Sequence, residues 1–176
     1  FDGCGSLESL DVSNFNTSSC GNMSAMFGRC EGLAGLDLSN FDTSACRNMC
    51  EMFNGCRGLI CLDLSGFDTT HVETMNGMFG ACTGLQELDI SSFSTSACKD
   101  MGGLFSDCES LCEINVTGFD TSECRNMHMM FGGCKALSNL DLTGFITSVC
   151  TDMSLMFYSC AGLETLDLGS FDTSEC

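Results

Sequence analysis

The sequence predicts an α/β fold, a right-handed solenoid of seven 26-residue coils, each built from a short parallel strand and a short helix. The first observation is that Phe-x-x-Cys recurs every 26 residues, without insertion or deletion, from Phe1 to Phe157. The second is that nine apolar positions in each unit hardly vary, although one unit alone could not bury them. The third is that each unit combines period-two alternation with helical spacing.

The repeat accounts for the whole chain of 176 residues, so we expect one repeat array over residues 1–176. No residues are left for a second domain. The units are 1–26, 27–52, 53–78, 79–104, 105–130, 131–156 and the partial unit 157–176.

The strand of each coil is predicted from residues 33–39, where apolar and polar side chains alternate. Asp37 and Ser39 are expected to face outward. Because the same pattern returns in every unit, these strands are expected to stack into a parallel sheet.

The helix is predicted from the apolar stripe that follows, since its spacing of three or four residues matches one face of a helix. The stripe consists of Cys46, Met49, Met52, Phe53 and Cys56. Thr43 and Ser44 would cap the start of this helix, and glycines after it would turn the chain back to the next strand.

The composition excludes several classes of function. The formal net charge is −18, from 24 acidic and 6 basic residues, and such a surface repels phosphate backbones and anionic lipids. We therefore expect no nucleic-acid partner. No apolar run approaches the roughly 20 residues of a membrane span. The two histidines, His71 and His128, occupy unrelated repeat positions, so no catalytic residues are expected and the protein is predicted not to be an enzyme.

The segment Met52-Phe53-x-x-Cys56-x-x-Leu59-x-x-Leu62-Asp63-Leu64-Ser65-x-Phe67-Asp68-Thr69, followed by Val72, resembles one known repeat. It is similar to the BspA-type leucine-rich repeat family, also described as the mycoplasma-lipoprotein type, whose units look like MFxxCxxLxxLDLSxFDTSxVTNM. The resemblance implies a leucine-rich-repeat solenoid and an extracellular or surface-anchored microbial protein, often linked to adhesion or host contact and not to catalysis. The chain departs from this pattern where cysteine replaces the valine in six units.

The 16 cysteines, about 9% of the chain, admit two main interpretations. They are either small buried hydrophobic residues or disulfides that staple the coils. Vertical pairs (Cys20–Cys46, Cys98–Cys124, Cys150–Cys176) and pairs within one coil, such as Cys82 with Cys98, remain alternatives. The disulfide candidates are Cys20, Cys46, Cys98, Cys124, Cys150, Cys176, Cys4, Cys30, Cys56, Cys82, Cys108, Cys134 and Cys160. A zinc or iron–sulfur site is disfavoured because the chain lacks a Cys-x-x-Cys pair.

One outward column is acidic and would form a ladder of carboxylates on the sheet face. Its members are Asp11, Asp37, Asp63, Asp89, Asp141 and Asp167, with Asn115 in the one exceptional unit. Each Asp is either solvated and bonded locally to Ser or backbone, or shares cations such as Ca²⁺ with the next rung, or meets basic side chains of a partner. Apart from possible Ca²⁺, no cofactor is expected.

A second column is an unbroken series of threonines, one per unit. Its members are Thr17, Thr43, Thr69, Thr95, Thr121, Thr147 and Thr173. A regular threonine array is typical of repeat-built ice-binding proteins, but the position of these residues fits helix capping better.

Together these patterns predict a non-enzymatic, extracellular or cell-surface adhesion or structural module. Its acidic sheet face would be presented to cations, glycans or protein partners. The alternative is an end-to-end assembling filament subunit, because the array shows no polar capping unit. A calcium- or ice-binding solenoid is a further alternative.

Overall fold

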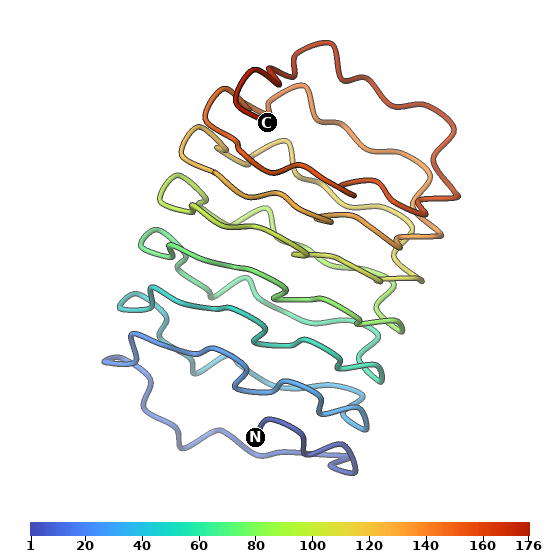
Figure 1. The fold of residues 1–176 in the computed structure, drawn as a ribbon. Helices are drawn as coiled ribbons and strands as arrows, with labels where there is room; N and C mark the ends of the chain where they lie inside the picture. Colours follow the sequence, from blue (N-terminus) through green and yellow to red (C-terminus); the bar gives the residue numbers. More distant parts are fainter.

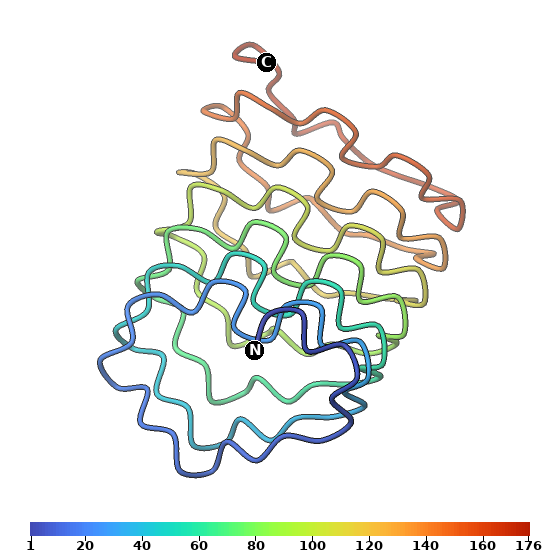
Figure 2. The same ribbon diagram turned by 60° about the horizontal axis from the view of Figure 1, so that its bottom comes forward.

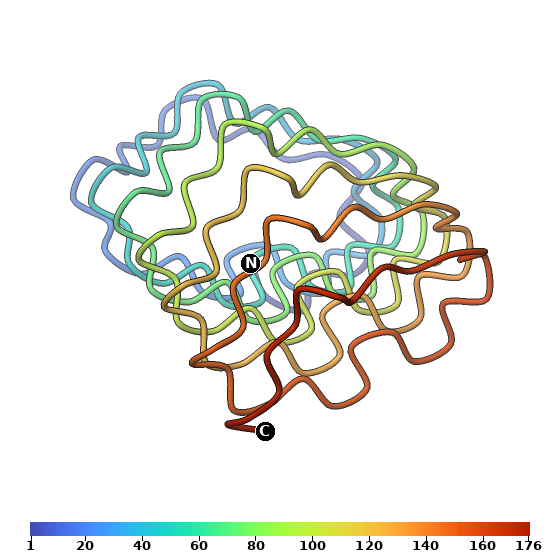
Figure 3. The same ribbon diagram turned by 90° about the horizontal axis from the view of Figure 1, so that it is seen from above.

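The computed structural model describes residues 1–176 and shows a stack of coils, with the two termini at opposite ends (Figure 1). Parallel bridges join equivalent residues of successive coils, 26 residues apart: Asn22 to Asn48, Asn48 to Thr74, Thr74 to Asp100, Asp100 to Asn126 and Asn126 to Asp152. Each coil surrounds a shared interior (Figure 2), and the view along the stack shows that successive coils are turned relative to one another (Figure 3). The predicted repeat solenoid is therefore confirmed.

The predicted helix is wrong, because the structure contains no α-helix. A helix needs each N–H to donate four residues back, but here alternate N–H groups donate to the next coil. Met49 N donates to Thr74 O at 3.0 Å, and Glu51 N donates to Asn76 O at 2.8 Å. The residues between them close tight turns, as Met52 N does to Met49 O at 3.2 Å.

Left-handed backbone at two places in each coil produces these turns. Glu51 has φ of 55° and Gly55 has φ of 72°, and the equivalent residues of the other coils are also left-handed. All 13 residues with positive φ occupy these two repeat positions: Ala25, Glu51, Gly77, Gly103, Met129 and Leu155 at one, and Gly3, Arg29, Gly55, Ala81, Asp107, Gly133 and Ser159 at the other. A helix could not include these conformations, which cost a non-glycine residue about 1–2 kcal/mol.

We call this side of the stack the bonded face, because backbone hydrogen bonds join its coils at every second residue. It comprises residues 21–29, 47–55, 73–81, 99–107, 125–133 and 151–159. Here Phe79 N donates to Leu104 O at 3.0 Å, and Lys99 N donates to Glu73 O at 2.9 Å.

The predicted parallel sheet is also wrong, since residues 33–39 and their equivalents form no strand. We call this side the open face: residues 8–13, 34–39, 60–65, 86–91, 112–117, 138–143 and 164–169. Only two backbone bonds join its coils, Gln86 N to Ile60 O at 3.0 Å and Ser138 N to Cys112 O at 3.3 Å. The predicted direction of the side chains is nevertheless confirmed, because Asp37 and Ser39 are exposed while Leu38 is buried.

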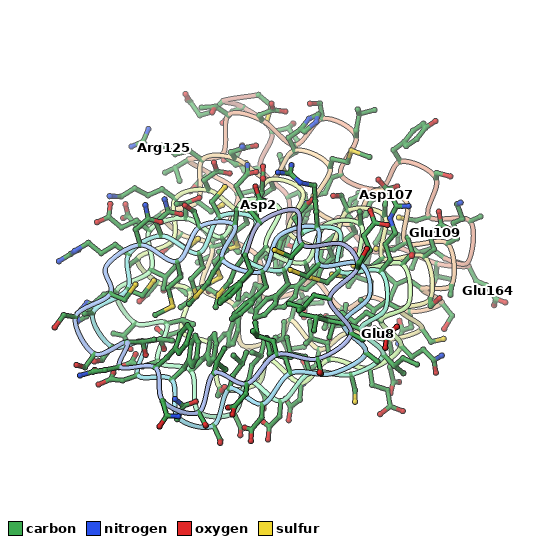
Figure 4. All side chains as sticks on the ribbon, turned by 90° about the horizontal axis from the view of Figure 1, so that it is seen from below. Asp2, Glu8, Asp107, Glu109, Arg125 and Glu164 are labelled. Carbon is green, nitrogen blue, oxygen red and sulfur yellow. The ribbon has the colours of Figure 1, made fainter.

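The core lies between the two faces and contains 45 buried apolar residues. Its spine is a ladder of rings from Phe1 through Phe27, Phe53, Phe79, Phe105 and Phe131 to Phe157, whose neighbouring centroids lie 5.7 to 6.1 Å apart. Figure 4 shows this carbon-rich interior, with acidic side chains projecting around it. Stacking thus buries what a single coil would expose.

Candidate functional site

The outward aspartates of the open face are each held by a residue two positions further along. Ser91 N donates to Asp89 Oδ1 at 2.9 Å, and Thr143 N donates to Asp141 Oδ1 at 3.0 Å. These backbone bonds, with those from the same residues' hydroxyls, lower the pKa of both carboxyl groups. The local bonding expected as one alternative is therefore present, and these carboxylates are fixed and charged.

Threonine side chains lie inside the molecule and bridge the coils. Thr69 Oγ1 donates to Ser94 O at 2.9 Å and accepts from Ser94 N at 2.8 Å. Thr43 bonds Asp68 in the same way. The helix-capping prediction is therefore wrong. Ice binding would require the threonines to form an array on the surface. They do not, because Thr17, Thr43, Thr69, Thr95, Thr121 and Thr147 are all buried.

Charge is divided unequally around each coil. We call residues 6–19, 32–45, 58–71, 84–97, 110–123, 136–149 and 162–175 the acidic half, which includes the open face. It carries 16 of the 24 acidic residues and none of the six lysines and arginines. Figure 4 places Glu8 and Glu164 of the acidic half on the same side of the stack, away from Arg125.

The basic residues all lie on the other half, where most form ion pairs. Glu73 bonds both Arg47, at 3.1 Å, and Lys99, at 3.0 Å. Lys135 pairs with Glu109 at 2.8 Å. These pairs are exposed and add little to stability, but the six basic residues offset all but two of the eight acidic residues of their own half and leave the acidic half uncompensated.

A groove crosses the open face at three successive coils. It has a volume of about 530 Å³ and is lined by residues 87–89, 113–117, 138, 139 and 141. Buried Leu88, Ile114 and Val116 form its floor, and exposed polar residues form its walls. Only one backbone hydrogen bond joins the coils at the groove, from Ser138 N to Cys112 O at 3.3 Å, so the coils are left open along most of it.

The aspartate ladder does not provide a set of metal ligands. No group of three or more His, Cys, Asp or Glu side chains is placed to hold a metal ion. The cation ladder proposed for Asp11, Asp37, Asp63, Asp89, Asp141 and Asp167 therefore stays a prediction without geometric support.

The cysteines are all free thiols in the structure, so the predicted disulfides are not confirmed. In one column each thiol donates to a carbonyl of the preceding coil, as Cys82 Sγ does to Phe53 O at 3.1 Å. In the other the thiol donates two residues along its own coil, as Cys124 Sγ does to Asn126 O at 3.3 Å. Burial raises the pKa of the Cys82 and Cys124 thiols to about 12, so both are protonated and unreactive at neutral pH.

Sequence reasoning missed one polar cluster, formed by His128, Asp152 and Ser154. Ser154 Oγ donates to Asp152 and lies 2.8 Å from His128 Nδ1. The 26-residue register could have found it, because Ser154 follows His128 by one repeat. The Ser154 hydroxyl thus lies between the Asp152 carboxylate and the His128 imidazole.

The geometry thus defines a class of protein, a repeat solenoid with a hydrogen-bonded face and an open, acidic face. The sequence profile of the family described as "Mycoplasma protein of unknown function, DUF285" matches residues 1–113 and 79–176. The chain belongs to this family, and the resemblance to the BspA-type, mycoplasma-lipoprotein repeats is confirmed.

The other comparisons found weaker similarity. A solved leucine-rich repeat protein from Bacteroides ovatus ATCC 8483 aligns with 17% identity and a TM-score of 0.39, over 65% of this chain and 33% of that one. The chain therefore spans about a third of that protein's length. No curated protein matches the chain. No helix of the structure has the length and apolarity to cross a membrane.

Proposed function

We propose that the chain is a non-enzymatic interaction module of the cell surface or extracellular space that binds basic protein partners through its acidic half. The observation that carries this proposal is the charge division: over the seven coils together, the acidic half carries 16 carboxylates and no lysine or arginine. Repeat solenoids bind partners through such extended regular surfaces. The surface location and the link to adhesion rest on the resemblance to the BspA-type family.

Lysine and arginine side chains of a partner protein fit this surface better than a free metal ion does. Each outward aspartate of the open face already uses one oxygen to accept a hydrogen bond from the N–H two residues further along, as Asp37 does from Ser39 N at 3.0 Å. Lysine and arginine side chains need only one or two acceptors each, whereas Ca²⁺ takes six to eight oxygen ligands. Ca²⁺, glycans and end-to-end assembly stay predictions, because no contact in the structure favours them.

The test is binding of the 176-residue chain to poly-L-lysine, with poly-L-glutamate as the matched probe of opposite charge. We expect binding only to poly-L-lysine, and a steep loss of affinity between 50 and 300 mM NaCl, roughly as the Debye length falls below 10 Å.

The variant that probes this surface is E8Q/E87Q/E113Q/E164Q. It removes four exposed carboxylates of the open face that form no hydrogen bond or ion pair, so the fold should be kept. We expect affinity for poly-L-lysine to fall at least tenfold. Unchanged affinity, or equal binding of the two polymers, would contradict the proposal.

A further inference from the structure

The groove over residues 87–89, 113–117, 138, 139 and 141 is the hollow of the acidic half that is lined mainly by polar and acidic residues. A smaller hollow of about 210 Å³ continues it between residues 90–93 and 115–119, and the two share Asn115 and Thr117. Together they form one depression that crosses successive coils.

The floor of the groove contains backbone groups without a partner. Leu88 and Ile114 are each only 8% exposed, yet neither the N–H nor the C=O of either residue bonds within the chain. The N–H of Val116, which is 1% exposed, is also unpaired. These backbone groups line an open groove, so water or a ligand that offers both donors and acceptors can satisfy them.

The walls of the groove supply negative charge. Glu87 and Glu113, on neighbouring coils, form no hydrogen bond or ion pair within the chain. Asp89 and Asp141 are held by Ser91 and Thr143, which orients their carboxylates and lowers their pKa. No lysine or arginine of the chain lies on this half, so a cation here must come from outside.

We propose that this groove binds an extended, lysine- or arginine-rich segment of a partner protein. The inference rests on the proposed function, and it names the place and the chemistry of the ligand. The backbone of an extended segment offers the C=O and N–H groups that the floor lacks, and its basic side chains lie among the carboxylates of the walls.

The coil spacing favours an extended segment. Alternate side chains of an extended chain are about 6.7 Å apart, twice the rise of a strand. Successive coils are somewhat closer together, since the stacked Phe79 and Phe105 rings, one from each coil, have centroids 5.9 Å apart. Over the three coils of the groove, every second residue of the segment would therefore lie near a new coil, and these are the positions where basic side chains are expected.

The experiment measures binding of two fluorescent octapeptides by anisotropy. One alternates lysine and serine, and the other has the same composition with its four lysines together. The groove variant E87Q/E113Q is compared with its matched control E8Q/E164Q, which makes the same chemical change at exposed glutamates of the open face outside the groove.

We expect the groove variant to weaken binding of the alternating peptide at least tenfold and the control to change it less than twofold. The clustered-lysine peptide should bind at least fivefold more weakly than the alternating one. Equal losses in the two variants would overturn the groove while leaving the acidic half as the binding surface. Equal binding of the two peptides would overturn the extended segment. Binding of neither peptide, nor of poly-L-lysine, would overturn the proposed function itself.

Discussion

The bonded face and the open face cover the same apolar core, yet they are built differently. On the bonded face, backbone bonds such as Phe79 N to Leu104 O join the coils at every second residue. On the open face only two backbone bonds cross between coils, and the aspartates accept bonds from their own coil instead. The comparison shows that one face holds the stack together while the other is left free to present charge and an open groove.

Alkaline unfolding should give the largest effect, because the thiols next to the bonded face are buried. Burial raises the pKa of Cys56, Cys82, Cys124 and Cys134 to about 12 and that of Cys98 to about 11, from 9.0. A folded-state pKa above the unfolded value gives stability that is present below pH 9 and lost as pH rises toward 12. We expect a loss of several kcal/mol over this window, measured by urea unfolding.

Alkylation provides the control for the alkaline prediction. At pH 8 the exposed Cys61 and Cys112 of the open face should react quickly, whereas Cys82 should react only on unfolding. Intact mass after alkylation in denaturant without reduction counts the thiols. Sixteen labels are expected, because all 16 cysteines are free thiols in the structure. Fewer labels would show that some cysteines form disulfides, as the sequence predicts.

Phe79→Ala should be the most damaging single substitution. The Phe79 ring is buried between Phe53, at 5.8 Å, and Phe105, at 5.9 Å, so its loss leaves a cavity in the ladder. We expect a loss of about 3–5 kcal/mol in the free energy of unfolding. Leu88→Ala, on the less tightly closed open face, should cost about 2 kcal/mol. Equal costs would show that the two faces are packed equally well.

Thr69→Val tests the side-chain bridge between successive coils. Valine keeps the volume but leaves the N–H and C=O of Ser94 without the Thr69 hydroxyl, so about 2 kcal/mol of stability should be lost. The neighbouring Thr70 is exposed, and Thr70→Val should change stability by less than about 0.5 kcal/mol. A thermal or urea midpoint for Thr69→Val equal to that of Thr70→Val would remove the bridge from the account.

Ala81→Gly should give a small gain in stability, because Ala81 of the bonded face has φ of 55°. Relief of about 1–2 kcal/mol of strain exceeds the roughly 0.4–1 kcal/mol that glycine costs through the unfolded chain. Ala34→Gly on the open face, where φ is not positive, should be destabilising by about 0.5 kcal/mol. A loss in both variants would argue against the left-handed turns.

The repeat, the inward columns and the outward direction of Asp37 and Ser39 could all be predicted from the sequence, because a gap-free period fixes which side chains stack. The helix could not be distinguished from a series of tight turns, since both place apolar residues three or four apart. Glycines at positions such as Gly55 and Gly77 were a usable signal, because a helix has no need of left-handed residues.

The groove was beyond sequence reasoning for a different reason. Alternation shows which side chains of residues 86–91 point outward, but it does not show whether the backbones of neighbouring coils bond to each other. The charge division was visible in the sequence, yet it became a surface only when the structure placed residues such as Glu87 and Glu113 on successive coils.

Amide hydrogen exchange tests the difference between the two faces most directly. We expect slow exchange, close to the limit of global unfolding, for the amides of Phe79, Met101 and Phe105, which donate between coils. We expect much faster exchange for the amides of Leu88 and Ile114, although their side chains are buried. Equal protection at both sets would mean that the open face is closed by backbone bonds, and it would contradict both the description of the fold and the groove.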